Sequence, residues 1–412
     1  MTRIADYAAL AAHMDRLGLF HMDLSLGRME AFWARRAMPE MPIIHVVGTN
    51  GKGSTAAFVC SLARAHGLKT GLFTSPHFVT PRERVQVNRA MLSRETWVDL
   101  ANDILSTPEG EALTYFEFQT CLAMLAFVRE GVDLAVMEAG LGGRWDATNV
   151  FSPYMTLFTP IGMDHEAILG PTLRDIATDK AGAIRPGGVV ITGVQPPEAM
   201  IPLQDRAERV RARFMHAVDM AGPVHDLPLG LFGIHQTANA RLALAAWRWF
   251  AADHGLKSEV ALERFGLESV FLPGRMQRIE LQGRAAILDG AHNVPALEAL
   301  NAALRAADVR PGALVFACLR DKNIEGMIPL VRTLTDGPVL VPPLHNERAS
   351  DNRELAERIG PCARPVGSLP EALAAARDGV RKSGEEPVLI CGSLYLLAEF
   401  YSVHREYLTP KG

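Results

Sequence analysis

The feature that most constrains this chain is a short apolar run that leads straight into a glycine-rich loop and then a helix. Residues 42–47 form the apolar run, which is typical of a buried strand. The loop that follows it is Gly48, Thr49, Asn50, Gly51, Lys52, Gly53, Ser54 and Thr55. Residues 52–66 then show a helical pattern that Gly67 ends. A strand, a loop and a helix in this order predict an α/β fold.

The same alternation of apolar runs and helical segments continues along the chain. A threonine–glutamate capping box at Thr114 and Glu117 predicts a helix over residues 116–128. The further predicted strands are residues 69–73, 132–137, 155–159, 189–194, 284–288, 313–318, 339–341 and 388–391. Strands that alternate with helices imply right-handed crossovers and a mostly parallel sheet.

The length of the chain indicates two domains. Its 412 residues exceed what one hydrophobic core usually supports. The strongest break in the pattern is the segment 272–274, because its Pro-Gly dipeptide interrupts regular structure. We therefore predict a larger N-terminal α/β domain over residues 1–273 and a smaller C-terminal α/β domain over residues 274–412.

The composition argues against several classes of protein. A net charge of −4 without a long basic run makes a nucleic-acid partner unexpected. No run of about 18 apolar residues could span a membrane, and residues 1–17 suggest an amphipathic helix rather than a signal peptide. The five cysteines are scattered without a C-x-x-C motif, which suits free thiols in a reducing compartment. We therefore expect a cytoplasmic protein.

The glycine loop has the residue types of a phosphate-binding loop. Glycines permit positive φ and let backbone N–H groups approach phosphate oxygens, and a helix N-terminus adds partial positive charge. Lys52 can reach the outer phosphates, and Ser54 or Thr55 can face a magnesium ion. The match to the usual P-loop pattern is imperfect, because Gly53 stands where serine or threonine is expected. An ordinary glycine-rich turn between a strand and a helix is the alternative.

Polar residues follow three of the predicted strands, at the edge where ligands of parallel sheets bind. They are Ser75 after residues 69–73, Glu138 after 132–137 and His165 shortly after 155–159. A carboxylate beside a phosphate loop suits a magnesium ligand or a group that orients water. The alternatives are a solvated acid for Glu138 and a hydrogen-bonded core histidine for His165.

In their order, these motifs resemble those of folylpolyglutamate synthases and dihydrofolate synthases, which belong to the Mur ligase superfamily. The similarity extends from about residue 23 to residue 400. The motifs that carry it are residues 48–54, 74–77, 114–117, 138–149, 164–165, 179–182, 272–275, 289–293 and 392–395. Gly53 after the lysine follows the folate enzymes, because related cell-wall amino-acid ligases usually have threonine there.

This resemblance implies an N-terminal P-loop ATPase domain and a smaller, Rossmann-like C-terminal domain. It also implies a reaction in which ATP phosphorylates a carboxylate of a folate or dihydropteroate. L-Glutamate then attacks the acyl phosphate, and ADP and phosphate are released. The expected cofactors are ATP and one or two Mg²⁺ ions, and we expect a monomer with small-molecule partners, no nucleic acid and no membrane.

The resemblance also implies roles for individual residues. Ser75, Glu138 and His165 would bind magnesium, and Lys52 would bind phosphate. Asn239 would contact adenine, and Arg275 and Asp289 would reach the nucleotide from the second domain. The candidate pterin contacts are Leu24, Phe116 and Asp146, and the candidate glutamate contacts are His292 and Ser393.

Lys180 follows a predicted helix start at residues 172–175 and lies near the third turn of that helix. A solvated lysine is the usual case at such a position. In the family that this chain resembles, this lysine is carbamylated, which requires a neutral amine and hence burial or nearby positive charge. We therefore predict carbamylation of Lys180.

Two departures from the family pattern lie in the C-terminal half. Val294 follows the motif 289–293 where the family commonly has proline, and Asn323 stands where a second aspartate is frequent. The glutamate contacts are therefore the part of the comparison with the least support from the sequence.

Several alternatives remain open at the level of the sequence. The chain could catalyse both dihydrofolate synthesis and polyglutamate extension, or only one of them, and residues 21–26 favour the bifunctional bacterial type. A Mur-type cell-wall ligase is a further enzyme alternative, which Phe116 and Gly53 disfavour. A regulatory GTPase would need a guanine-reading N-K-x-D motif, which the sequence lacks.

Overall fold

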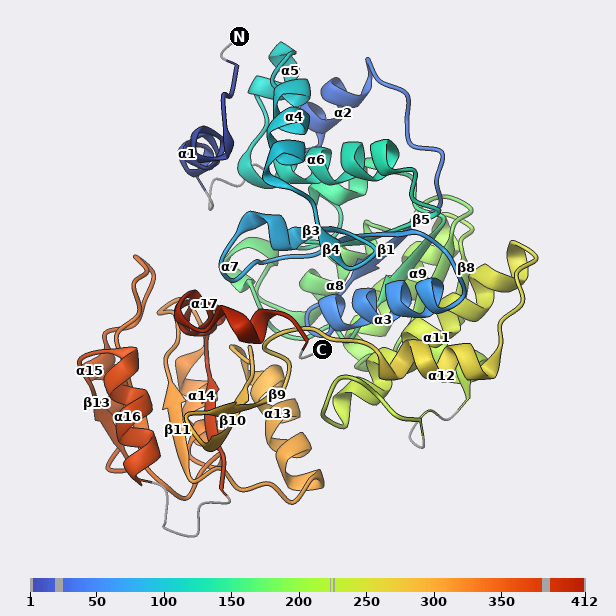
Figure 1. Cartoon of the computed structure of the whole chain (residues 1–412). Helices are drawn as coiled ribbons and strands as arrows, with labels where there is room; N and C mark the ends of the chain where they lie inside the picture. Colours follow the sequence, from blue (N-terminus) through green and yellow to red (C-terminus); the bar gives the residue numbers. More distant parts are fainter. Residues whose placement is uncertain (1–2, 19–24, 223, 225–226, 380–385, 411–412) are drawn as a thin grey trace. The chain divides into compact units, whose positions relative to one another are not determined.

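The structure is a computed structural model that describes residues 3–18, 25–222, 224, 227–379 and 386–410. The chain forms two compact units, and each contains one mostly parallel sheet with helices around it (Figure 1). The first unit consists of Met1–Pro228 and Asn239–Leu267, and the second of Leu229–Ala238 and Glu268–Gly412. The predicted α/β class is confirmed.

The first unit is built on an eight-stranded sheet with the order β4-β3-β2-β5-β1-β6-β7-β8. Its strands are β1 (Ile43–Val47), β2 (Thr70–Phe73), β3 (Val85–Val87), β4 (Ala90–Met91), β5 (Leu134–Glu138), β6 (Met155–Phe158), β7 (Val189–Thr192) and β8 (Arg213–His216). Only β3 and β4 run antiparallel to their neighbours. The strand β1 lies between β5 and β6 and is buried along its whole length, as its apolar sequence predicts.

Helices cover both faces of this sheet. They are α1 (Tyr7–Leu17), α2 (Gly27–Trp33), α3 (Lys52–Ala65), α4 (Arg94–Ile104), α5 (Pro108–Glu111), α6 (Tyr115–Glu130), α7 (Glu166–Leu169), α8 (Leu173–Ala181), α9 (Pro197–Arg209), α10 (Ala217–Ala221), α11 (His235–Asp253) and α12 (Val260–Glu268). The short 3₁₀ helices are η1 (Pro81–Arg84) and η2 (Ala147–Val150). Figure 1 shows α3 and α6 on opposite sides of the sheet.

The long helix α6 forms where the sequence predicts it. Its capping box is present, because the Thr114 hydroxyl and the Glu117 carboxylate each satisfy a backbone N–H at the helix start. Gly131, with φ of 60°, ends the helix in the left-handed conformation. Phe118 and Phe127 of this helix are fully buried in the core that α1 and α4 share with β2 and β5.

The second unit has a six-stranded sheet with the order β13-β12-β11-β14-β10-β9, in which only β9 is antiparallel. Its strands are β9 (Gln277–Leu281), β10 (Arg284–Leu288), β11 (Ala313–Phe316), β12 (Val339–Val341), β13 (Ala363–Pro365) and β14 (Val388–Cys391). Its helices are α13 (Val294–Ala306), α14 (Ile324–Val331), α15 (Asn352–Ile359), α16 (Leu369–Gly379), α17 (Leu394–Val403) and the 3₁₀ helix η3 (Arg405–Leu408). The predicted bounds of β10, β12 and β14 are confirmed. No helix among the described residues is long and apolar enough to cross a membrane.

Candidate active site

The glycine loop connects β1 to α3 in a conformation that only glycine fits at two positions. Gly48 has φ of 152°, and a Cβ atom there would lie 1.9 Å from the Thr159 hydroxyl. Gly51 has φ of 86°, and a Cβ atom there would lie 2.3 Å from Oδ1 of Asn239. The loop therefore packs closely against both neighbours while α3 begins at Lys52.

The segment after β6 supports this loop from behind. The backbone N–H groups of Thr49 and Asn50 donate to the carbonyl oxygen of Pro160, at 3.1 and 3.3 Å. The Thr49 hydroxyl also lies 3.1 Å from both the backbone nitrogen and the carbonyl oxygen of Gly162. Lys52 bends back over the loop, and its Nζ donates to the carbonyl oxygen of Thr49 at 3.0 Å. The loop and the segment toward His165 are thus fixed to each other.

The first turn of α3 presents two hydroxyl groups that suit a nucleotide and its metal ion. The hydroxyls of Ser54 and Thr55 are buried and have no hydrogen-bond partner within the described parts of the chain. A buried polar group without a partner is costly, so these hydroxyls fit a ligand that would satisfy them. The helix N-terminus and Lys52 supply positive charge at the same place. These groups together fit the phosphates of a nucleotide with a bound cation.

Glu138 and Ser75 meet at the same edge of the sheet as this loop. Glu138 ends β5 and pairs in register with Val46 of β1, one residue before that strand ends. Its Oε2 accepts a 3.0 Å hydrogen bond from the backbone nitrogen of Ser75, which follows β2. Glu138 is only 4% exposed, so the alternative of a solvated acid is wrong.

His165 lies shortly after Pro160 and Gly162, the residues that contact the glycine loop. It has φ of 56° and precedes α7, and its backbone nitrogen donates to Oδ1 of Asp164 at 2.9 Å. Its side chain is 40% exposed, so the alternative of a buried core histidine is wrong. Among the described residues, no three His, Cys, Asp or Glu side chains gather as a metal site on their own. Mg²⁺ commonly takes one or two carboxylates together with phosphate oxygens and water, and Glu138 supplies one such carboxylate.

Lys180 is buried against the glycine loop instead of being solvated. It lies on α8, which begins at the predicted helix start and has a capping box formed by Thr172 and Asp175, and it is 4% exposed. Its Nζ donates a 2.9 Å hydrogen bond to the carbonyl oxygen of Gly48. Burial and the positive charge of Lys52 lower the pKa of Lys180 to about 7. A large fraction of this amine is therefore neutral near neutral pH.

Phe116 packs against the loop of residues 139–146, and Asp146 is the last residue of this loop. The Phe116 ring packs so closely on Gly140 that a Cβ there would lie 2.6 Å from its Cζ. Asp146 is 6% exposed, and its Oδ2 accepts from the backbone nitrogen of Leu141 at 2.8 Å. Burial raises the pKa of Asp146, and hydrogen bonds from Thr148 and from the loop backbone oppose that rise. The structure therefore brings two of the three predicted pterin contacts together.

The third predicted pterin contact, Leu24, lies outside the described residues. Nearby, Arg28 on α2 forms a bidentate ion pair with the buried Glu117, with nitrogen–oxygen distances of 2.8 and 2.9 Å. Since Glu117 follows Phe116, this pair ties α2 to the first turn of α6.

Two residues near the site, Asp179 and His45, were given no role from the sequence. Asp179 accepts from the backbone nitrogen of Gly143 at 2.9 Å and so supports the loop of Asp146. His45 lies within β1 and contacts the hydroxyl of Thr148 at 2.7 Å. His45 could have been found as the single imidazole inside an apolar strand, because a buried polar side chain usually has a hydrogen-bond partner.

In the second unit, Arg275 and Asp289 lie close together. Asp289 follows β10 and is 6% exposed, and its two carboxylate oxygens accept from the backbone nitrogens of Ala291 and Met276, both at 2.8 Å. A Cβ on Gly290 would lie 2.4 Å from Nη1 of Arg275. Burial lowers the pKa of the adjacent His235, and Asp289 and Arg275 act on it in opposite directions.

His292 and Ser393 occupy neighbouring strand ends of this unit. Nδ1 of His292 lies 2.7 Å from the carbonyl oxygen of Gly290, and the backbone of Gly392 donates to Ala291 at 2.9 Å. Ser393 is buried, and its hydroxyl accepts from the backbone nitrogen of Tyr395 as the N-cap of α17. The two predicted glutamate contacts therefore follow β10 and β14, which pair in parallel.

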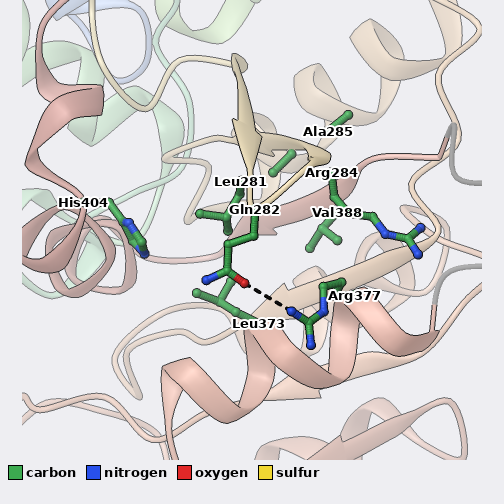
Figure 2. A pocket seen from close by; sticks show the side chains of 9 residues that line it. Leu281, Gln282, Arg284, Ala285, Leu373, Arg377, Val388 and His404 are labelled. Atoms are coloured by element: carbon green, nitrogen blue, oxygen red, sulfur yellow. Dashed lines mark hydrogen bonds between the residues drawn. The ribbon is translucent and has the colours of Figure 1, made fainter.

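A small cavity of about 40 Å³ lies elsewhere in the second unit (Figure 2). The sheet, α16 and the end of α17 line it, and Arg377 donates to Gln282 at its wall. It contains none of the predicted site residues, and its volume holds only one or two water molecules.

A parallel sheet with a glycine loop, and a second α/β unit with its own strand-end motifs, match the architecture of the Mur ligase superfamily, to which the folate ligases belong. Residues 274–394 match the family model described as Mur ligase, glutamate ligase domain. The chain is 34% identical to the dihydrofolate synthase/folylpolyglutamate synthase of Bacillus subtilis, over 92% of this chain and 95% of that protein. The chain belongs to the dihydrofolate synthase/folylpolyglutamate synthase family.

Solved structures of this family share the whole fold. Escherichia coli FolC in complex with DHPP and ADP has a TM-score of 0.86 at 29% identity and covers 98% of this chain and 99% of its own. The bifunctional Yersinia pestis enzyme, complexed with AMPPNP and a Mn ion, has a TM-score of 0.84 at 27% identity over 98% and 99% of the two chains. These relatives are ATP-dependent folate and glutamate ligases; both structures hold a nucleotide, and the Yersinia pestis structure also holds a divalent metal ion.

Proposed function

We propose that this chain is an ATP-dependent ligase that joins L-glutamate to dihydropteroate and to tetrahydrofolate. The carboxylate of the pterin substrate takes the γ-phosphoryl group of ATP, so that a carboxyl–phosphate bond forms and ADP leaves. The amine of glutamate then attacks the acyl carbon, an amide bond forms, and phosphate is released. The observation that carries this proposal is the glycine loop, whose close packing, lysine and buried hydroxyls fit a triphosphate.

The chain's own residues divide the work of the first step. Lys52 and the N-terminus of α3 offset the charge of the phosphates, and Ser54 and Thr55 donate or accept at the same place. Ser75, Glu138 and His165 would hold one or two Mg²⁺ ions, which supply charge neutralisation at the transferring phosphoryl group. Asn239, fixed against Gly51, would contact adenine, and Arg275 and Asp289 would bind nucleotide as well.

Lys180 is proposed to carry a carbamate. Addition of CO₂ to the neutral Nζ forms a carbon–nitrogen bond, breaks one carbon–oxygen π bond and releases one proton, which converts the neutral amine into an anion. The burial of Lys180 and the charge of Lys52 support this, because both favour the neutral amine that reacts. The carbamate would act as an additional magnesium partner next to the glycine loop.

The substrate contacts follow from the same reading of the site. Phe116 and Asp146, with Leu24, would bind the pterin, and His292 and Ser393 would bind the incoming glutamate. We propose that residues 1–273 act as the ATP-binding domain and residues 274–412 as the glutamate-ligase domain. We also propose that the protein acts as a cytoplasmic monomer on small molecules, without nucleic acid; the net charge of −4 supports the absence of a nucleic-acid partner.

The bifunctional reading is preferred over a monofunctional one because the relative from B. subtilis carries both activities in its name and matches nearly full length. Purified protein, ATP and glutamate are incubated with dihydropteroate or with tetrahydrofolate, and ADP and the folate products are measured. Product from both pterins supports the proposal, and product from only one would leave a monofunctional enzyme.

A further inference from the structure

A buried histidine in the central strand is connected to the loop of Asp146 by a chain of hydrogen bonds. His45 is in the middle of β1 and is only 1% exposed. Its Nε2 lies 2.7 Å from the hydroxyl oxygen of Thr148, which is 103 residues away in the sequence. That hydroxyl also donates to Oδ1 of Asp146, so three buried polar groups stand in a row.

The direction of this chain follows from the count of protons. A threonine hydroxyl has one proton, which Thr148 donates in its hydrogen bond to the Asp146 carboxylate. The same hydroxyl oxygen must therefore accept the hydrogen bond from His45. Burial lowers the pKa of His45 to about 3, so the imidazole is neutral and carries one N–H. Nδ1 of His45 has no partner among the described residues, which leaves Nε2 as the donor.

The chain fixes the orientation of the Asp146 carboxylate. Its Oδ1 accepts from both the backbone nitrogen and the hydroxyl of Thr148, and its Oδ2 accepts from Leu141. Without His45, the hydroxyl of Thr148 would be free to rotate away and to donate elsewhere. His45 lies on the strand that also leads into the glycine loop, and this strand is buried and paired with β5 and β6 on its two sides.

We propose that His45 is a positioning residue for the pterin substrate, which acts through Thr148 to hold the Asp146 carboxylate in its binding orientation. This inference rests on the proposed function, in which Asp146 contacts the pterin. The strand β1 would then have two roles. It leads into the loop that binds the nucleotide, and its residue His45 positions a side chain that binds the pterin.

The test compares variants that break the hydrogen-bond chain from His45 to Asp146 with variants that retain it. His45→Met and Thr148→Val remove one hydrogen bond each, whereas His45→Gln keeps a donor near Nε2 and Thr148→Ser keeps the hydroxyl. Thr156→Val is the matched control, because Thr156 is equally buried and pairs with His45 in register but takes no part in the chain. The KM values for dihydropteroate and for ATP are measured for each variant, together with the melting temperature.

We expect His45→Met and Thr148→Val to raise the KM for dihydropteroate about tenfold, the effect of one lost hydrogen bond, with the KM for ATP nearly unchanged. His45→Gln and Thr148→Ser should recover most of the loss, and Thr156→Val should match the wild type. An equal rise in both KM values, no rise in either, or a loss in Thr156→Val would overturn the inference. If His45→Met does not fold, the pair Thr148→Val and Thr148→Ser decides alone. A wild-type enzyme without pterin-dependent turnover would instead refute the proposed function.

Discussion

The ammonium nitrogen of Lys180 donates a 2.9 Å hydrogen bond to the carbonyl oxygen of Gly48, the first residue of the glycine loop. This contact joins α8 to the loop over 132 residues of sequence and buries a cation beside a second cation, Lys52. The arrangement is unfavourable for a charged lysine. It therefore predicts measurable consequences for the protonation and for the chemical modification of Lys180.

The burial of Lys180 predicts a pH-dependent stability. Its folded-state pKa of about 7 lies below the unfolded value of 10.5, so between these values the unfolded chain binds the extra proton. The free energy of unfolding should therefore rise with pH, by up to about 1.4 kcal/mol per pH unit. Urea unfolding of wild type and of Lys180→Met in CO₂-free buffer, in which Lys180 is an unmodified amine, tests this between pH 7 and about 8.5, the usual pKa of a thiol. The same slope in both proteins would contradict the assigned pKa.

Carbamylation of Lys180 can be detected directly. Protein equilibrated with ¹³C-bicarbonate should give a carbamate carbon signal by NMR, because a neutral amine near pH 7 reacts with CO₂. Lys180→Arg should lack that signal, whereas Lys69→Arg should keep it, since Lys69 is a partly exposed lysine paired with Glu130. A signal that persists in Lys180→Arg would place the modification elsewhere.

The close packing of Gly51 predicts a loss of nucleotide affinity on substitution. Gly51→Ala adds a methyl group where Oδ1 of Asn239 lies 2.3 Å away, so the loop or the Asn239 side chain must shift. Gly67→Ala is the control, because Gly67 has a φ of 88° but open space around it. Both variants should lose roughly 1 kcal/mol of stability. Only Gly51→Ala should weaken ADP binding, by tenfold or more in calorimetry, which is about 1.4 kcal/mol. Equal ADP affinity in the two variants would contradict the assigned role of the loop.

The buried hydroxyl of Ser54 predicts opposite effects on the free and the nucleotide-bound protein. Ser54→Ala removes a polar group without a partner among the described residues, so the free protein should keep its melting temperature or gain slightly. The increase in melting temperature with Mg²⁺ and AMPPNP should become smaller. Ser61→Ala on the same helix should lower the melting temperature of the free protein, because the Ser61 hydroxyl accepts from Arg64 at 3.4 Å. It should leave the increase in melting temperature with Mg²⁺ and AMPPNP unchanged.

Removal of the loop lysine should lower turnover by orders of magnitude without unfolding the protein. Lys52→Ala takes away a cation that offsets the phosphate charge, and the loss of one such group lowers kcat by about 10²–10³. Circular dichroism should show an unchanged fold, and Lys69→Ala serves as the control. Activity of Lys52→Ala near the wild-type level would remove the lysine from the mechanism.

Much of the fold could be predicted from the sequence, because buried parallel strands are apolar and α6 carries its own capping box. The bounds of β10 and β12 followed from this pattern, and β5 was placed to within two residues. The short strands β3, β4 and β13 and the edge strands β8 and β9 were not predicted. They are two to five residues long and none is buried along its whole length, so the sequence shows no clear apolar run there.

The site was only partly accessible to the same reasoning. The loop and the strand-end residues Ser75 and Glu138 could be predicted to share one edge, because parallel strands end there together. The burial of Lys180 and the contact between His45 and Thr148 depend on segments more than 100 residues apart, and no local pattern reports such a contact. The roles of the individual site residues stay predictions.

The central claim is that nucleotide turnover at the glycine loop depends on both a pterin carboxylate and glutamate. The most direct measurement is ADP release from ATP by the purified protein, with dihydropteroate and glutamate present together, each alone, or both absent. We predict release of ADP in step with formation of dihydrofolate only when both are present. ADP release that is indifferent to the pterin and to the amino acid would contradict the account.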